Sequence, residues 1–340
     1  MPLLLGYKAS AEQFGPQRLL DLAVAAEKAG FDSVWTSDHF QPWRHTGGHA
    51  PSALVWLGAA SQATQRVILG TSVLTPSFRY NPAMVAQAFA TLGVLAPKRI
   101  ILGVGTGESM NEVPVGVTWP EQSERFARLK EAVVLIQQLF REQFVTFEGE
   151  YYRTHEATIY DRPDEPVPIY IAASGPAAAR LAGRIGDGLI VTSGKGAELY
   201  TDVLLPGLAE GAAKADRDPA TLPKMIEMKV SYDPDRAKAL ADCKIWSALA
   251  LPSDRKLGVD DPREMERLAK EAEPIAYRRW LVASEPEEHI EQIATYINYG
   301  FDHLVFHFPT NEQEAEIARY GEQILPRLRA RFGTAEPVGA

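Results

Sequence analysis

One short pattern occurs three times along the chain and constrains its fold more than any other feature. KAGFDSV at residues 28–34, RIGDGLIV at 184–191 and NYGFDHLVF at 298–306 each join a helical pattern to an apolar, β-branched run. The glycine can take the left-handed conformation that ends a helix, and an aspartate precedes the strand. The chain therefore repeats a helix-to-strand turn, which is typical of alternating β and α units.

Eight short apolar segments are strand candidates, and eight helical patterns alternate with them. Most strand candidates are continuous apolar runs, as in parallel strands that are buried on both faces. The count favours an α/β fold of the (β/α)8 TIM-barrel type, with a doubly wound open sheet as the alternative. The strand candidates are residues 3–7, 33–36, 67–72, 100–104, 169–173, 188–192, 226–230 and 303–308, and the helical patterns are residues 16–29, 52–64, 82–95, 123–140, 176–184, 197–215, 286–299 and 312–332.

Three segments are longer than ordinary connections between strands and helices. Residues 105–121 follow the fourth strand, residues 231–280 follow the seventh, and FVTFEGEYYR within residues 142–168 predicts a hairpin. Long insertions of this kind are usually functional. Because no low-complexity tract or linker interrupts the pattern, we expect residues 1–340 to form a single barrel domain, with a tail that frays from about residue 333.

The bulk composition excludes several classes of protein. The chain has 340 residues, of which 46% are hydrophobic and 23% charged, as in a globular protein with a large core. A net charge of -9 argues against nucleic acid or an anionic membrane as the main partner. The single cysteine, Cys243, can form no internal disulfide, and the apolar start at residues 2–6 is too short for a signal peptide. We therefore expect a cytoplasmic protein.

Residues able to do chemistry gather directly after the strand candidates. The densest segment is SDHFQPWRHTGGHAP at residues 37–51, which contains Asp38, His39 and Trp43. In a barrel the active site lies at the carboxyl ends of the strands. Polar, small or titratable residues also follow the other strands: Lys8, Glu12, Ser72, Thr75, Thr106, Gly107, Glu108, Asn111, Ser174, Gly175, Thr192, Lys195 and His307.

Some motifs in these segments admit more than one interpretation. GVGTGE at residues 103–108 lacks the third glycine of a dinucleotide-binding loop, which favours close backbone approach to a flat ring or phosphate. The histidines of residues 37–51 match no zinc spacing, and we expect no metal. TSGKG at residues 192–196 places Lys195 between glycines, where amides and an ammonium can hold phosphate. Position alone does not separate surface from ligand roles for Lys256 and Arg279.

Almost the whole chain resembles one family. The strings that carry the resemblance are GYKASAEQF, SDHFQPWRHTGGHAP, LGTSVLTPSFRYNPA, LGVGTGESMNEV, TSGKG, DDPREME and HLVFHFP. They are similar to glucose-6-phosphate dehydrogenases that depend on the deazaflavin coenzyme F420, within the luciferase-like (β/α)8 barrels. The resemblance implies a cytoplasmic homodimeric enzyme that oxidises glucose 6-phosphate at C1 to 6-phosphogluconolactone, with hydride transfer to C5 of the deazaflavin. It leaves open whether other sugar 6-phosphates are also substrates.

The resemblance also assigns residues to three groups. The catalytic group is His39, Trp43 and Glu108, with Glu12 in the same pocket. The sugar-phosphate group is Thr192, Lys195, Lys256 and Arg279. The cofactor group is Asp38, Ser72, Val73, Thr75, Thr106, Gly107, Asn111, Ser174 and Gly175, and the Ser72–Val73 bond corresponds to a non-proline cis peptide. Two positions depart from the family pattern: the loop EVPVGVTWPEQ after Asn111 is shorter, and Ser174 stands where glycine is usual.

The reaction needs a base for the O1 proton and an acid for the ring of the cofactor. His39 suits the base because imidazole titrates near neutral pH, and Glu108 suits the acid where burial raises its pKa. The resemblance leaves these two roles exchangeable. Rival interpretations are an FMN-dependent luciferase-like monooxygenase and a non-catalytic flavin-binding relative. His39, Glu108 and the three basic residues of the phosphate group speak against both.

Overall fold

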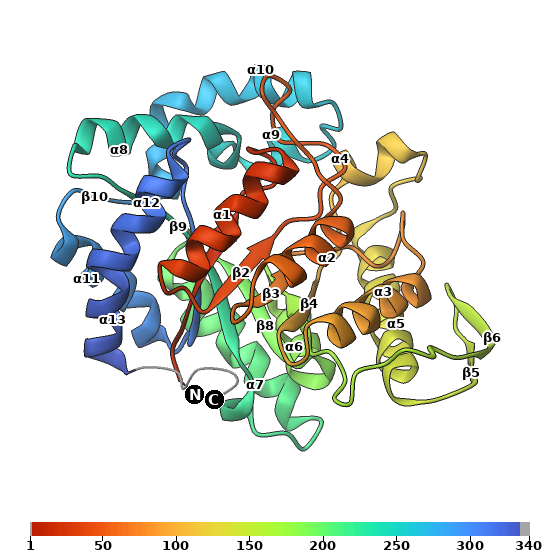
Figure 1. Ribbon diagram of the computed structural model, residues 1–340. Coiled ribbons are helices and arrows are strands. Elements are labelled where there is room, and N and C mark those ends of the chain that lie inside the picture. Colours follow the sequence, from red (N-terminus) through yellow and green to blue (C-terminus); the bar gives the residue numbers. More distant parts are fainter. Residues whose placement is uncertain (1, 334–340) are drawn as a thin grey trace.

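Eight parallel strands close into a barrel in the computed structural model, which describes residues 2–333 (Figure 1). Neighbours around the barrel follow the order β9, β11, β1, β2, β3, β4, β7 and β8, and β8 pairs back with β9. The predicted (β/α)8 barrel is confirmed and the open-sheet alternative is wrong. The strands are β1 (Leu4–Ala9), β2 (Ser33–Thr36), β3 (Ile68–Thr71), β4 (Ile100–Val104), β7 (Ile169–Ala172), β8 (Gly188–Thr192), β9 (Lys224–Tyr232) and β11 (His303–His307).

Helices surround the barrel (Figure 1). They are α1 (Pro16–Lys28), α2 (Ala53–Ala63), α3 (Pro82–Leu95), α5 (Gln122–Arg141), α6 (Pro176–Ile185), α7 (Leu205–Ala213), α11 (Pro286–Tyr299), α12 (Gln313–Arg319) and α13 (Leu325–Phe332). Two predicted helices contain a widened, π-helical stretch, at Leu199–Leu204 and Tyr320–Ile324. A proline, Pro206 or Pro326, follows each stretch within two residues and cannot donate the regular helical hydrogen bond. The expected frayed tail lies outside the described residues beyond Gly333.

The same type of hydrogen bond occurs at each of the three repeated turns. In each, the aspartate before the strand accepts from the first backbone amides of a neighbouring strand. Asp32 Oδ2 accepts from Leu5 N at 2.9 Å, Asp187 Oδ2 from Ile169 N at 2.9 Å, and Asp302 Oδ1 from Lys224 N at 2.8 Å. The repeated aspartate therefore fixes the register of adjacent strands.

The glycines of these turns differ. Gly30 and Gly300 have φ of 94° and 110°, the predicted left-handed conformation. Gly186 has φ of -76°, so the left-handed prediction is wrong there. A Cβ at Gly186 would lie 2.8 Å from Ala182 O, so this position requires glycine for close packing on its own helix.

The inside of the barrel has an apolar layer below a charged one. Trp35, Ile68, Ile101, Tyr170, Ile190, Met225 and Val305 form the apolar layer. Side chains alternate along a strand, so Glu227 and Lys229 point to the same side as Met225, closer to the carboxyl end of β9. Lys8 on β1 and His307 on β11 occupy the corresponding positions of their strands. The barrel mouth is thus lined by buried charges.

The insertions after barrel strands β4 and β9 lie over the mouth (Figure 1). The first contains α4 (Ser109–Glu112) and a 3-10 turn at Val113–Val115. The second contains α8 (Arg236–Asp242), α9 (Ser253–Lys256), α10 (Pro262–Ala272) and 3-10 segments Cys243–Ala250 and Glu273–Arg279, and ends in β10 (Leu281–Ala283), which pairs with β9. The predicted hairpin is confirmed as β5 (Val145–Glu148) and β6 (Arg153–Ala157), and a 3-10 turn at Pro219–Thr221 precedes β9.

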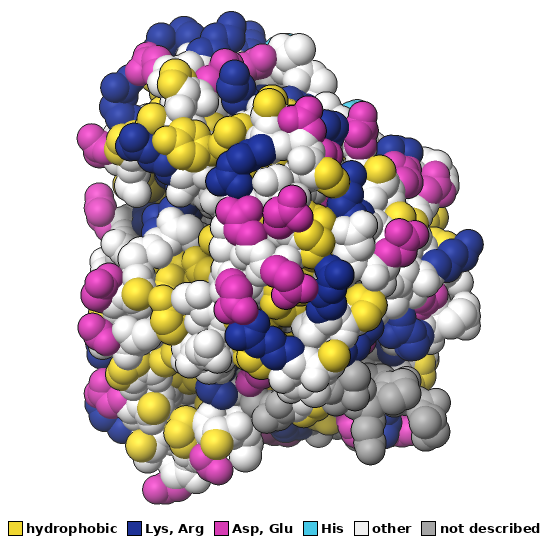
Figure 2. All heavy atoms as spheres, turned by 90° about the vertical axis from the view of Figure 1, so that its left-hand side faces the viewer, with side chains coloured by type: hydrophobic (Ala, Val, Ile, Leu, Met, Phe, Trp, Pro, Cys, Tyr) yellow, Lys and Arg dark blue, Asp and Glu magenta, His cyan; other side chains and the backbone are white. Residues whose placement is uncertain are grey.

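Acidic and basic side chains are interspersed on the face that contains α11 and α13 (Figure 2). Ion pairs such as Arg236–Glu288 and Arg327–Glu287 cross between elements there. The described residues of this face form no continuous basic surface of the kind that binds polyanions. Among residues 2–333, no helix combines the length and apolar character needed to cross a bilayer.

Candidate active site

His39 lies between two carboxyl groups at the barrel mouth. Its Nε2 is 3.2 Å from Glu12 Oε1 and 3.6 Å from Glu108 Oε2, and its ring centre is 6.1 Å from that of Trp43. Its Nδ1 is 3.1 Å from the carbonyl oxygen of Gln41, which can only accept. Nδ1 therefore carries a hydrogen, and Nε2 is the nitrogen that can exchange a proton with a bound molecule.

The two carboxyl groups beside His39 differ in pKa. Burial acts to raise both. At Glu12, the neighbouring His39 and Lys8 and a 2.8 Å hydrogen bond from Ser37 Oγ outweigh burial and lower the pKa. At Glu108, burial and the charge of Glu12 prevail over His39 and Lys256, and the pKa is raised. Because 47% of the Glu108 side chain remains accessible, it can still contact a bound molecule.

Three basic residues from distant segments meet beside this group. Lys195 follows β8, Lys256 ends α9, and Arg279 ends the 3-10 segment Glu273–Arg279. Burial lowers the pKa of all three, and the charge of Arg279 lowers that of Lys195 and Lys256 further. Lys256 also lies 5.9 Å from the ring centre of Trp43. The mutual repulsion of these cations makes the place suited to an anion.

The loop that carries Lys195 is held by its neighbours. Tyr200 donates its hydroxyl hydrogen to Thr192 O at 2.9 Å and accepts from Lys195 N at 3.2 Å, while Arg279 donates to Gly194 O. Gly194 has φ of 77°, and a Cβ there would lie 2.8 Å from Arg279 O. Only glycine fits without strain, so the loop and Arg279 are fixed relative to each other.

The predicted cofactor residues surround the same mouth from the neighbouring strands β2, β3, β4 and β7. The Ser72–Val73 peptide bond is cis, as the resemblance implies. Lys8 Nζ donates to Ser72 O at 2.8 Å and to Ser72 Oγ at 2.6 Å, and Asn111 Oδ1 accepts from Phe40 N at 2.9 Å. The remaining members are Asp38 and Thr75, both buried, Thr106 and Gly107 after β4, and exposed Ser174 with Gly175 at the start of α6.

Glycines occur in two of these segments for different reasons. Gly107 has φ of 82°, and a Cβ there would lie 2.9 Å from the side chain of Thr75. A Cβ at Gly175 would meet nothing within 4 Å and would project into open space. Gly107 therefore allows its loop to pack closely against Thr75, whereas the backbone at Gly175 is free to approach a phosphate closely.

Sequence reasoning missed Arg79, which clamps the loop of His39. Arg79 Nη2 donates to Asp38 O at 2.6 Å, and its guanidinium forms ion pairs with the carboxylates of Asp38 and Glu112. Tyr80 OH donates to Asp38 Oδ1 at 3.2 Å. The side chain of Glu112 is fully buried and that of Asp38 nearly so. The string FRYNPA contained Arg79, but nothing local identified partners so far away in the sequence.

Sequence reasoning also missed two charged residues of β9. Glu227 Oε2 lies 3.1 Å from Lys8 Nζ, and Glu227 Oε1 lies 3.7 Å from His307 Nδ1 and 3.8 Å from Lys229 Nζ. Charges at alternate positions of the otherwise apolar segment KMIEMKVSY were the available indication, because they place both side chains on one face of a buried strand.

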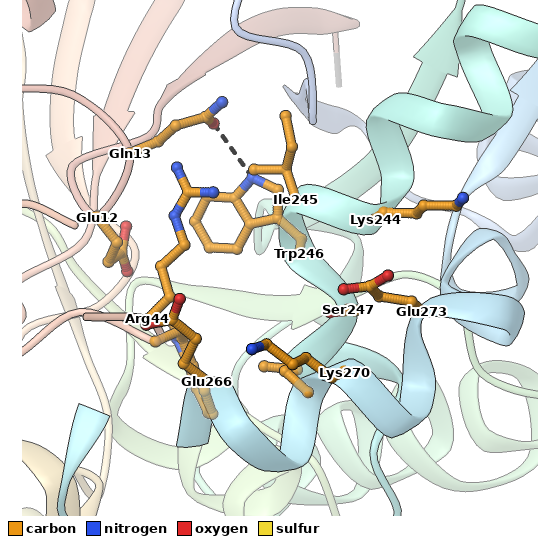
Figure 3. A pocket seen from close by; sticks show the side chains of 13 residues that line it. Glu12, Gln13, Arg44, Lys244, Ile245, Trp246, Ser247, Glu266, Lys270 and Glu273 are labelled. Atoms are coloured by element: carbon orange, nitrogen blue, oxygen red, sulfur yellow. Dashed lines mark hydrogen bonds between the residues drawn. The ribbon is translucent and has the colours of Figure 1, made fainter. Parts of the chain in front are cut away.

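A cavity of about 130 Å³ borders the catalytic group from the side of the second insertion (Figure 3). Glu12, Trp43, Trp246 and Lys270 are among the residues that line it. Trp246 Nε1 donates to Gln13 Oε1 at 3.1 Å across its edge. None of the predicted phosphate-binding residues lines this cavity, and its charged side chains carry both signs.

The barrel, its two insertions and the polar mouth are those of a luciferase-like barrel. The model of the luciferase-like monooxygenase family matches residues 4–303. Sequence comparison narrows this class, because the chain is 64% identical over 334 residues to an F420-dependent glucose-6-phosphate dehydrogenase of Nakamurella multipartita, covering 98% of each chain. The chain belongs to the family of F420-dependent glucose-6-phosphate dehydrogenases.

Further similar proteins also depend on F420. An F420-dependent glucose-6-phosphate dehydrogenase of Mycobacterium tuberculosis is 55% identical over 331 residues, covering 96% of this chain and 98% of the relative. Among solved structures, an F420-dependent secondary alcohol dehydrogenase in complex with an F420-acetone adduct superimposes with a TM-score of 0.92 at 37% identity, covering 97% of this chain and 100% of that one.

Proposed function

We propose that this protein oxidises glucose 6-phosphate at C1 to 6-phosphogluconolactone with coenzyme F420 as the oxidant. One observation carries the proposal: the acid–base group of His39, Glu12 and Glu108 shares a barrel mouth with three converging cations. Lys256 links the acid–base group to the cation group, since it lies over the ring of Trp43 and its charge acts to lower the pKa of Glu108. Relatives that share 55–64% of their residues with this chain carry the same activity in their names.

The residues at the mouth fit a deazaflavin with an anionic tail. When bound, F420 supplies a deazaflavin ring whose C5 accepts the hydride. Ser72, Val73 and Thr75 would back the ring with Gly107 packed against Thr75, and the open backbone at Gly175 would admit the tail. We assign Asp38, Thr106, Asn111 and Ser174 to the same group. The carboxylate of Asp38 already meets Arg79 and Tyr80, so its part is to hold the loop.

His39 accepts the O1 proton of the sugar through Nε2. The Gln41 carbonyl fixes the ring by its bond to Nδ1, and the Glu12 carboxylate lies where it stabilises the imidazolium that forms. The lowered pKa of Glu12 keeps this carboxylate charged at neutral pH. The raised pKa of Glu108 favours its protonated form relative to an ordinary glutamate, so Glu108 is the residue that would supply the proton to the ring of the cofactor. Trp43 forms a wall of the sugar site.

The phosphate group of the substrate binds to Lys195, Lys256 and Arg279, with Thr192 on the same loop. Selectivity among sugar 6-phosphates then depends on hydroxyl contacts, which the shorter loop after Asn111 leaves less constrained. We therefore also propose turnover of other aldose 6-phosphates such as mannose 6-phosphate at lower kcat/KM, and activity on glucose 6-phosphate alone would contradict this extension. Fructose 6-phosphate, whose anomeric carbon carries no hydrogen, serves as the comparison that should not react.

The test of the proposed function is a reduction assay. Purified protein should decolourise oxidised F420 when glucose 6-phosphate is added, and NADP or FMN should not replace F420. Reduction of FMN with oxygen-dependent turnover, or binding of F420 without any turnover, would instead favour a monooxygenase or a non-catalytic flavin-binding protein.

We further infer that the chain acts as a single-domain, cytoplasmic homodimer. Four apolar side chains are exposed on the adjacent helices α2 and α3, namely Val55, Met84, Val94 and Leu95. Exposed apolar side chains on neighbouring helices suit a symmetric contact between copies. Light scattering of the wild type and of Met84→Lys tests the pairing, and a monomeric wild type would contradict it.

A further inference from the structure

Lys229 is a buried ammonium group that lacks a carboxylate of its own. Its side chain is 5% exposed, and the nearest carboxylate oxygen that the described residues offer is Glu227 Oε1 at 3.8 Å. Glu227 Oε2 lies closer to Lys8 Nζ, at 3.1 Å, and Glu227 Oε1 also faces His307 Nδ1, at 3.7 Å. One carboxylate therefore serves two ammonium groups and an imidazole.

The other charges that act most strongly on Lys229 are positive. They come from Arg279 at the end of a 3-10 segment, Lys8 on β1 and Lys256 on α9. His307 on β11 also faces it, with both ring nitrogens buried and lacking hydrogen-bond partners within residues 2–333. Burying a cation among cations is costly unless an anion compensates it. Arg279 and Lys256 belong to the proposed phosphate site, so an anion bound there would compensate Lys229 as well.

Hydrogen bonds tie Lys229 to the loop of that site. Lys229 N donates to Ser193 Oγ at 2.8 Å, and Ser193 N donates to Glu227 O at 2.9 Å. The next residue, Gly194, accepts from Arg279. Strand β9 and the loop that carries Lys195 are thus one hydrogen-bonded unit, and a displacement of either would move the other.

We propose that Lys229 is a fourth cation of the sugar-phosphate site and binds the phosphate group from the barrel side. This rests on the proposed function and adds a substrate-binding residue to it. Burial, together with the charges of Arg279, Lys8 and Lys256, lowers the pKa of Lys229 to about 8 against the opposing effect of Glu227. A bound dianion raises that pKa again. Substrate binding therefore takes up a proton above pH 8, and affinity falls as the pH rises further.

The experiment compares Lys229→Met and Lys229→Arg with the wild type. Loss of one charge-assisted contact should raise KM for glucose 6-phosphate about 10- to 100-fold in Lys229→Met, with kcat changed only a few-fold. The inhibition constant of inorganic phosphate should rise in parallel, while the Kd for F420, measured by fluorescence quenching, stays near the wild-type value. Lys224→Met is the matched control, because Lys224 lies at the opposite end of β9 and pairs with Asp302.

The pH dependence adds a second readout. From pH 7 to 9 the wild-type KM should rise about tenfold through Lys229, since one pH unit above its pKa leaves about a tenth of it charged. Lys229→Arg, which stays charged, should keep a low KM and lose this rise, together with the proton uptake seen by calorimetry in buffers of different ionisation enthalpy. This variant keeps the test decisive if Lys229→Met does not fold.

Two results would overturn the proposal while the proposed function stands. One is an active Lys229→Met enzyme with an unchanged KM and an unchanged phosphate inhibition constant. The other is a wild-type rise of KM with pH that persists in Lys229→Arg. A wild type that neither turns over nor binds glucose 6-phosphate in calorimetry would instead reject the proposed function and the fourth cation with it.

Discussion

Nε2 of His39 lies 3.2 Å from Oε1 of Glu12, while Nδ1 of the same ring faces the Gln41 carbonyl. Both ring nitrogens thus point at acceptors, which suits the imidazolium that forms when His39 takes up a proton. The Gln41 carbonyl on Nδ1 orients the ring, and the Glu12 carboxylate beside Nε2 stabilises the charged form.

His39→Ala should lower kcat by about 10² to 10⁴ and leave F420 binding near normal, because a general base acts in the transition state. His39→Asn should be equally slow, since an amide of similar shape cannot accept the proton. Single-turnover rates and F420 fluorescence quenching measure both quantities. An active His39→Asn enzyme would reject the base role and show that the ring only packs the loop.

Glu108→Gln should remove the alkaline limb of the pH–rate profile. The pKa of Glu108 is raised by burial and by Glu12, so its protonated form persists to higher pH than in an ordinary glutamate. Donor activity is present below this raised pKa and is lost as the pH rises through it. A profile of log kcat against pH checks this, with Glu150→Gln on the exposed hairpin turn as the control. If the alkaline limb of the pH–rate profile is unchanged in Glu108→Gln, the titrating group is another residue.

Neutralising Lys195, Lys256 or Arg279 should mainly raise KM for the sugar phosphate. Each charged hydrogen bond is worth roughly 1.5–3 kcal/mol, or about one to two decades in KM. Steady-state kinetics of Lys195→Ala, Lys256→Ala and Arg279→Ala measure the effect. If all three leave KM unchanged, the phosphate site lies elsewhere.

Arg79→Met should lower the free energy of unfolding by about 3–5 kcal/mol, because it leaves two buried carboxylates, Asp38 and Glu112, without their cation. Urea unfolding measures the change. The control is Arg18→Met, which removes a half-exposed pair with Glu314 and should cost under about 1 kcal/mol. Equal losses for the two variants would contradict the importance of burial for Arg79.

Stability should fall as the pH drops below 6.5 because burial lowers the pKa of three histidines, His289, His303 and His307. Burial lowers the pKa of His303 to about 3 and that of His289 to about 4. The unfolded chain therefore binds more protons than the native one between these values and 6.5, which costs up to about 1.4 kcal/mol per pH unit for each group. Urea unfolding from pH 7 to 5 measures the slope. His303→Gln should flatten it and exposed His155→Gln should not.

The sequence by itself determined the local order of the barrel. Continuous apolar runs identified all eight barrel strands, because parallel strands buried on both faces need no alternation. The Gly/Asp turns were equally visible, since a glycine at φ of 94° and an aspartate beside a strand start are local requirements. Once the strands were identified, the residues that follow them could be assigned to the mouth, because the carboxyl ends of parallel barrel strands lie at one end of the barrel.

Only the tertiary structure decided which of those residues face one another. Arg79 meets Asp38 across 41 residues, and Lys8 meets Glu227 across more than half of the chain. Such pairs depend on the closure of the barrel and on its stagger, which no local period encodes. The pKa differences between Glu12 and Glu108 arise in the same way, because burial and neighbouring charges, rather than residue type, set them.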